Sequence, residues 1–130
     1  MNVIIAGIDP AWRPHIASWI CRAFKHLGCN VWRVSSADEA EEQSKYVDPV
    51  YVVPAACLGS SAGGRGGVGA CAAAIGVKPD LFVMVDAGWN YAVQNDGTCP
   101  YAYIWREANL DEDRRVVPAA AGAPIFQCMV

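Results

Sequence analysis

The residues best suited to chemistry follow short apolar runs of the chain. Asp86 comes directly after the run Leu81–Val85, and Gly88 and Trp89 lie just beyond it. A short apolar run bounded by turn residues is typical of a strand buried on both faces of a parallel sheet. Such sheets bind ligands in the crevice beyond the carboxyl ends of their strands. We therefore predict that Asp86, Gly88 and Trp89 line a ligand pocket at that edge.

A second polar group, Asp9, Trp12, Arg13 and His15, follows the first apolar run of the chain. His15 has the chemistry of a general base, Arg13 that of an anion clamp, and Trp12 that of a platform for a sugar ring or a base. If the first run is a strand of the same sheet, this group reaches the same edge as Asp86. The simpler alternative is that Asp9 caps the next helix and His15 only occupies its first turn.

Arg106 completes the predicted pocket, because it follows another apolar run, Tyr101–Trp105. With its neighbours Glu107 and Asp111 it also fits a surface salt-bridge cluster, which is the alternative interpretation. The spacing favours no metal site, since the six cysteines contain no C-x-x-C pair and the two histidines are far apart.

The glycine-rich loop, residues 58–69, contains a G-x-G-x-x-G pattern formed by Gly64, Gly66 and Gly69. That pattern binds the pyrophosphate of a dinucleotide when it directly follows a strand, and Asp86 lies at a suitable distance to hold the ribose. Here about ten residues, one of them a proline, separate the first glycine from the preceding apolar run, which favours a flexible or close-packing loop. Cofactor binding by these glycines is kept as an alternative, and no resident cofactor is expected otherwise.

The order of apolar runs and helical periods predicts a single Rossmann-like α/β domain over residues 1–130. A mostly parallel central sheet of five to six strands is expected, with helices on both faces. The expected strands are Val3–Ile8, Asn30–Ser35, Val50–Val53, Leu81–Val85, Tyr101–Trp105 and Ile125–Met129. Three helices are expected. The first runs from Ile16 to Leu27, the second is an acidic stretch that begins at Ser36 or Asp38, and the third runs from Ala70 to Ile75.

The first of these helices carries the strongest periodic signal. Its apolar residues are predicted to form one buried stripe, namely Ile16, Trp19, Ile20, Ala23, Phe24 and Leu27. Lys25 and His26 place positive charge at its carboxyl end, and Gly28 is suited to a left-handed cap. A strand, a helix, a glycine and a second strand in this order predict one right-handed βαβ unit.

Composition limits the functions that the chain can have. Its 130 residues allow one domain with one core, and 54% hydrophobic with 18% charged residues exclude a disordered chain. The net charge of −3 and the scattered basic residues argue against a nucleic-acid-binding surface.

The chain start lacks a secretory leader and no apolar stretch is long enough to cross a bilayer, so we expect a cytoplasmic protein with reduced thiols and no membrane contact.

The segment Lys78–Asp86 resembles the "kPDLvlv" strand in the amino-terminal, Rossmann-like domain of GT-B glycosyltransferases. The nearest type is the spore-maturation-protein group of glycosyltransferase-like proteins. Leu27–Val31 is similar to the "lG-x-x-V" step that ends the first helix of that group, and Pro100–Trp105 and Ala123–Gln127 are similar to its later strands. The resemblance implies the acceptor-side half of a glycosyltransferase-like protein, with its pocket at the strand ends. Such proteins have a second, carboxyl-terminal domain for most nucleotide-sugar contacts, so residues 1–130 alone are expected to be inactive and to need that missing domain or a partner subunit.

Two other functions stay open at this point. The low charge, the five tryptophans, the five tyrosines and the apolar end Ile125–Val130 also fit a non-catalytic structural or interaction subunit, including a homo-oligomer. The glycine-rich loop also fits a nucleotide- or dinucleotide-binding module.

Overall fold

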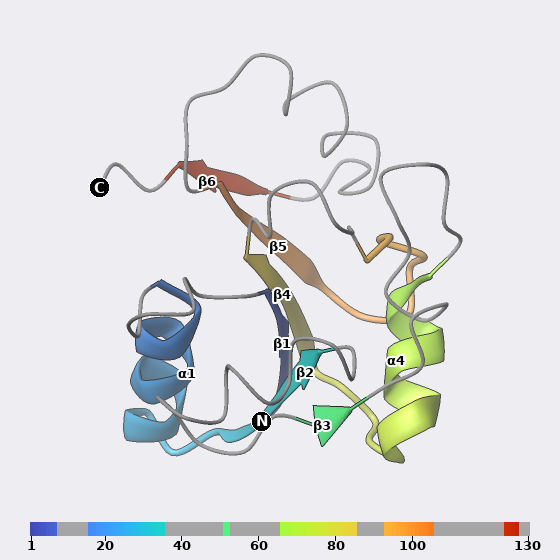
Figure 1. Ribbon diagram of the computed structural model, residues 1–130, viewed down its shortest axis with the longest axis horizontal. Coiled ribbons are helices and arrows are strands. Elements are labelled where there is room, and N and C mark those ends of the chain that lie inside the picture. The colour runs from blue at the N-terminus through green and yellow to red at the C-terminus, as the bar shows by residue number, and fades with distance from the viewer. Residues whose placement is uncertain (8–15, 36–50, 53–65, 86–92, 106–123, 128–130) are drawn as a thin grey trace.

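The computed structural model describes residues 1–7, 16–35, 51–52, 66–85, 93–105 and 124–127. A parallel β-sheet with the strand order β3-β2-β1-β4-β5-β6 forms the body of the molecule (Figure 1). The strands are β1 (Asn2–Ala6), β2 (Asn30–Ser35), β3 (Tyr51–Val52), β4 (Leu81–Val85), β5 (Tyr101–Trp105) and β6 (Ile125–Gln127). The described helices are α1 (Ile16–His26) and α4 (Val68–Ile75). The prediction of an α/β fold with a parallel sheet is confirmed.

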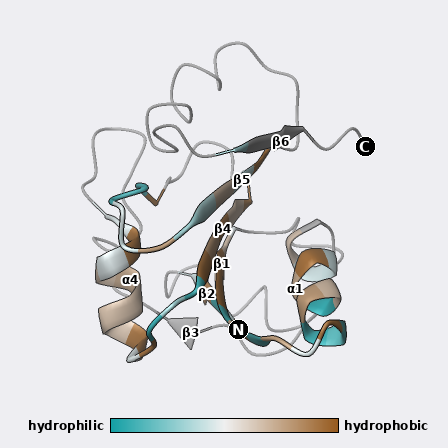
Figure 2. Cartoon of the chain, turned by 180° about the vertical axis from the view of Figure 1, so that it is seen from behind, coloured by the Kyte–Doolittle hydropathy of each residue, from teal (hydrophilic) through white to brown (hydrophobic). Residues whose placement is uncertain are grey.

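Strands β1 and β4 lie side by side in the middle of the sheet. Each has four consecutive buried residues after a partly buried first one, and both are coloured as hydrophobic in Figure 2. In the register, Ile4 lies opposite Trp32 of β2 and Phe82 of β4. Because protein covers both faces of these strands, their sequences are continuous apolar runs rather than alternating ones. The outer strands β3 and β6 are much shorter, and β2 pairs with β3 only through Val34 and Ser35.

Alternate side chains of each strand point to opposite faces and build two separate cores. Helix α4 packs on the face that carries Ile4, Phe82 and Tyr103, and helix α1 packs on the face that carries Ile5 and Val83. The side chains buried on the α4 face are those of Ile4, Ala6, Val34, Val68, Cys71, Ala72, Phe82, Met84, Val93, Tyr101 and Tyr103. Those buried on the α1 face are Val3, Ile5, Ala17, Cys21, Val83 and Val85. The sheet therefore separates the molecule into two apolar layers.

Helix α1 is present, but its buried stripe differs from the predicted one. Trp19 is 54% exposed, and Leu27, just past the helix end, is 75% exposed, so the prediction that they face the core is wrong. Ala23 is exposed as well, whereas Ile20 and Phe24 of the predicted stripe do pack against the sheet core. They do so together with Ala17 and Cys21, so the buried face keeps the helical spacing but is rotated from the predicted one. Small residues at two of these positions let the helix approach the strands closely. The buried Arg33 of β2 also donates a hydrogen bond from Nη1 to Ser18 Oγ at 3.2 Å, which favours this rotation.

Each of the two described helices is followed at its carboxyl end by a glycine with a left-handed backbone. Gly28 after α1 has φ of 85°, as predicted, and Gly76 after α4 has φ of 70°. The amide of Val77 donates to the carbonyl of Ala72 at 3.1 Å, which satisfies a carbonyl at the end of α4. The acidic helix predicted from Ser36 or Asp38 lies outside the described residues.

Asn2 aligns the amino ends of the three central strands. Its amide donates to Asp80 Oδ2 at 2.7 Å, and its side-chain amide donates to the carbonyl of Lys78 at 3.1 Å. Its side-chain oxygen accepts a hydrogen bond from Asn30 Nδ2 at 3.1 Å. One polar side chain thus connects β1 to the residues that enter β2 and β4.

Gly7 determines how closely the carboxyl ends of β1 and β4 approach each other, because it follows β1 directly and lies against the last residue of β4. Its φ is 147°, a conformation that other residues rarely adopt. A Cβ atom there would lie 2.7 Å from Val85 Cβ and 2.8 Å from the carbonyl oxygen of Val85. Both are shorter than any ordinary contact, so no residue with a side chain fits without moving the two strands apart.

The first prediction concerns this contact. Gly7→Ala should lower the free energy of unfolding by about 3 kcal/mol, because it combines backbone strain with a clash against β4. Gly28→Ala is the matched control, since Gly28 also has positive φ but a Cβ atom added there would meet no other part of the chain within 4 Å; it should cost only about 1 kcal/mol. Urea unfolding of both variants measures the two values. Equal losses would contradict the close approach of β1 and β4.

Candidate functional site

The carboxyl ends of three neighbouring strands meet at one edge of the sheet. Ala6 of β1 pairs with Met84 of β4, and Val85 of β4 pairs with Ile104 of β5. The predicted pocket residues continue from these strand ends, but they lie outside the described residues and stay a prediction. They are Asp9, Trp12, Arg13 and His15 after β1, Asp86, Gly88 and Trp89 after β4, and Arg106 after β5.

The last four residues of the glycine-rich loop, 66–69, are described, and they pack against a distant segment of the chain. Gly67 forms a parallel bridge with Gln94, in which the Gln94 amide donates to the carbonyl of Gly66 at 2.9 Å. The amide of Val68, the first residue of α4, donates to the carbonyl of Gln94 at 3.2 Å. Gly66 and Gly69 are therefore part of a packed structure, whereas Gly64 lies outside the described residues.

Asp96 accepts hydrogen bonds at the start of α4. Its Oδ2 accepts one from the amide of Gly69 at 3.0 Å, and its Oδ1 accepts two from Thr98, from the amide at 3.1 Å and from the hydroxyl at 2.6 Å. The amide groups in the first turn of a helix have no partner within the helix and attract negative charge. A carboxylate of the chain itself thus takes the position that a phosphate group occupies in a dinucleotide-binding loop.

The surroundings of Asp96 favour its charged form. Partial burial alone would raise the pKa of the carboxyl group, but the hydrogen bonds from the Thr98 hydroxyl and from the amides of Gly69 and Thr98 outweigh it. The pKa of Asp96 is therefore held below its ordinary value of 3.8. No feature named in the sequence analysis pointed to Asp96 as an interaction partner. The next residue, Gly97, has a left-handed backbone with φ of 80°.

The segment before β5 is fastened to the core by Tyr101. Its hydroxyl donates to the carbonyl of Val93 at 2.5 Å, and its ring stacks on Phe82 with 5.3 Å between the ring centroids. Burial, with a smaller contribution from Cys71, raises the pKa of Tyr101 far above its ordinary value, so the hydroxyl stays protonated and keeps donating. The amide of Phe82 also donates to the carbonyl of Pro100 at 2.9 Å.

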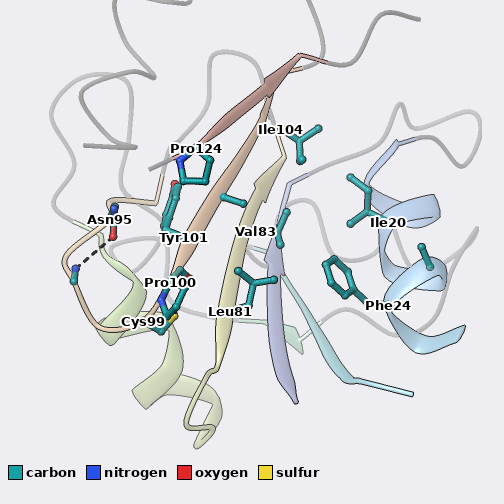
Figure 3. A pocket seen from close by; sticks show the side chains of 13 residues that line it. Ile20, Phe24, Leu81, Val83, Asn95, Cys99, Pro100, Tyr101, Ile104 and Pro124 are labelled. Atoms are coloured by element: carbon teal, nitrogen blue, oxygen red, sulfur yellow. Dashed lines mark hydrogen bonds between the residues drawn. The ribbon is translucent and has the colours of Figure 1, made fainter. Parts of the chain in front are cut away.

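An open cavity of about 810 Å³ lies on the α1 face of β4 and β5. Figure 3 shows Ile20 and Phe24 of α1 on one side and Cys99 and Pro100 on the other, with Leu81 and Val83 of β4 between them. The remaining lining residues are Ala23, Asn95, Gly97, Tyr101, Ala102, Ile104 and Pro124. The lining runs along the strands from Leu81 and Tyr101, the first residues of β4 and β5, to Ile104, which pairs with the last residue of β4. No feature of the sequence pointed to it, because residues from separate stretches of the chain form it.

The cavity offers mainly apolar contacts. Its polar side chains are Tyr101, whose hydroxyl donates to the carbonyl of Val93, Asn95, whose Oδ1 accepts a hydrogen bond from the amide of Gly97 at 3.4 Å, and Cys99. The Cys99 thiol donates to the carbonyl of Pro100 at 3.3 Å. Burial, together with the negative charges of Asp96 and Asp80, raises the pKa of this thiol. Cys99 is thus a protonated, weakly reactive thiol at neutral pH rather than an activated nucleophile.

Comparison with protein-family models, with curated proteins and with solved structures finds no significant match to this chain. Within the described ranges, His, Cys, Asp and Glu side chains form no group of three or more that could hold a metal ion. None of the described helices is long and apolar enough to cross a membrane.

The second prediction concerns Asp96. Asp96→Ala should lower the free energy of unfolding at pH 7 by about 1 kcal/mol, the usual effect of removing a helix-capping side chain. Because the folded-state pKa of Asp96 is depressed, its contribution is present above the unfolded-state pKa and is lost as the pH falls through the folded-state value. The difference in stability between the wild type and Asp96→Ala should therefore shrink below about pH 4. Urea unfolding from about pH 7 to about pH 2.5 measures it, and a difference that stays constant down to the lowest pH would contradict the capping role.

Proposed function

We propose that the chain is the acceptor-side, Rossmann-like half of a glycosyltransferase-type protein, and that it binds a hydroxyl-rich ligand over the ends of β1 and β4. The observation that carries this proposal is the strand order. In doubly wound sheets, ligands bind where neighbouring strands lead the chain in opposite directions. Here that point falls between β1 and β4, because β2 and β3 lie on one side of β1 and β4, β5 and β6 lie on the other.

The chain leaves β1 and β4 at neighbouring positions. Gly7 directly follows β1, has no side chain, and lies against Val85, the last residue of β4. The next residue along the chain is Ile8 after β1 and Asp86 after β4. The strand exits are therefore adjacent, and no side chain at Gly7 separates them.

The residue types that follow the strands fit a sugar better than a phosphate. Asp9 and Asp86 can accept hydrogen bonds from hydroxyl groups, and Trp12 and Trp89 can stack on the apolar face of a sugar ring. Arg13 and Arg106 can bind a carboxylate or phosphate carried by the ligand. By contrast, the amide of Gly69 in the glycine-rich loop is engaged by Asp96, so the described contacts give no support to dinucleotide binding there.

Catalysis by this half alone is not part of the proposal. By the family resemblance, the contacts to the nucleotide sugar belong to a second domain or a partner subunit. A role as an interaction subunit or a homo-oligomer stays a prediction, and so does the cytoplasmic location.

The third prediction tests the pocket with known probes. Glucose, galactose, N-acetylglucosamine and UDP-glucose are titrated separately into the isotopically labelled chain, and amide shifts are followed by NMR. At least one sugar should shift the amides of Ala6, Gly7 and Val85 and leave those of Asn2 and Asn30 unchanged. Shifts centred on the amino ends, or no shift with any probe, would contradict the proposal.

Two variants at opposite ends of β4 sharpen this test. Asp86→Asn should weaken sugar binding about tenfold, the effect of removing a hydrogen bond to a charged group. Asp80→Asn is the matched control, because it removes the same charge at the amino end of the same strand and should change the affinity less than about twofold. Equal effects of the two variants would exclude Asp86 from the site. Release of UDP from UDP-glucose by the isolated chain would contradict the expectation that this half is inactive without a second domain or a partner subunit.

A further inference from the structure

We propose that the Asp96 carboxylate is a latch that couples the glycine-rich stretch at the start of α4 to one wall of the apolar cavity. The segment of residues 93–100 carries both features. One side of it contacts α4, and the other side lines the cavity between α1 and the sheet (Figure 3).

The two ends of this segment are held by contacts that do not involve Asp96. At its beginning, Gln94 is bridged to Gly67, and the carbonyl of Val93 accepts the hydrogen bond from Tyr101. At its end, the carbonyl of Pro100 accepts a hydrogen bond from the amide of Phe82 at the start of the β4–β5 pairing. Loss of the Asp96 contacts therefore leaves the segment attached at both ends and frees its middle.

The middle of the segment is closely fitted to α4 through Asp96 and Thr98. A Cβ atom at Gly67 would lie 2.8 Å from Asp96 Oδ2, and one at Gly69 would lie 3.1 Å from Thr98 Oγ1. Glycine at these two positions thus leaves room for the carboxylate and the hydroxyl. The close packing of this glycine-rich stretch is accounted for by contacts within the chain.

The cavity side of the same segment consists of Asn95, Gly97, Cys99 and Pro100. Asp96 and Thr98 alternate with these residues along the chain, so each latch residue is covalently next to residues of the cavity wall. Asp96, Gly97 and Thr98 are exposed, and hydrogen bonds exposed to water open more readily than those of the core strands. Opening of the latch therefore moves the wall away from β4 and β5 without unfolding of the sheet, and increases the exposure of Cys99, which is partly exposed in the closed arrangement.

Site-resolved alkylation of the full chain with iodoacetamide tests this coupling. Mass spectrometry gives the modification rate of Cys99 relative to Cys29, a free and partly exposed thiol beyond the carboxyl end of α1 that serves as an internal reference. Thr98→Val removes the hydroxyl donor but keeps the charge of Asp96, and Asp96→Asn removes the charge. Both should raise the relative rate at Cys99 by about fivefold, the change that corresponds to one net hydrogen bond.

Asp80→Asn separates opening from a simple electrostatic effect. Asp80 and Asp96 both raise the pKa of the Cys99 thiol, but only Asp96 contacts α4. If the latch controls access, Asp80→Asn should change the relative rate less than about twofold. An unchanged rate in Thr98→Val, or equal effects of Asp80→Asn and Asp96→Asn, would overturn the proposal. Should Asp96→Asn unfold, which circular dichroism would reveal, the milder Thr98→Val decides alone.

Discussion

The pairing of β1 with a neighbour on each side is the interaction on which the rest of the structure depends. Its backbone bonds to β2 on one edge and to β4 on the other, and residues 3–6 are fully buried. Each buried strand side chain removes apolar surface from water, at about 25 cal/mol per Å², and the parallel ladder satisfies the backbone groups that burial would otherwise leave unpaired. Two close contacts at the strand ends maintain the register: Asn2 connects the amino ends, and Gly7 lets the carboxyl ends touch.

Much of this sheet could be predicted from the sequence, because the signal is local. The unbroken run Leu81–Val85 is a strand with the predicted bounds, and the glycine after each described helix is left-handed. The rotation of α1 could not be predicted in the same way. Several apolar stripes fit its sequence, and the correct one is selected by how closely the helix can approach the sheet and by the contact of Arg33 with Ser18. Helical period identifies a helix more reliably than it identifies the buried face.

The glycine-rich loop shows why a motif alone is weak evidence for a function. Glycines before a helix allow an anion to approach the helix start closely, and the anion can be a ligand phosphate or a carboxylate of the same chain. Here Asp96 fills that position from 27 residues beyond Gly69. No sequence rule pairs these two residues, since the contact depends on how the segment before β5 passes α4. The apolar cavity was not predictable for the same reason, because its lining exists only after the strands and α1 have packed together.

The most direct test of the central claim is a measurement of cross-strand nuclear Overhauser effects between β1 and its two neighbours. The structure predicts amide-to-Hα contacts that match a parallel register, with Ile4 opposite both Trp32 and Phe82. Close Hα-to-Hα contacts, which mark antiparallel pairing, or the absence of any contact between β1 and β4 would contradict it. In that case the shared carboxyl edge and the proposed pocket over β1 and β4 would both be lost.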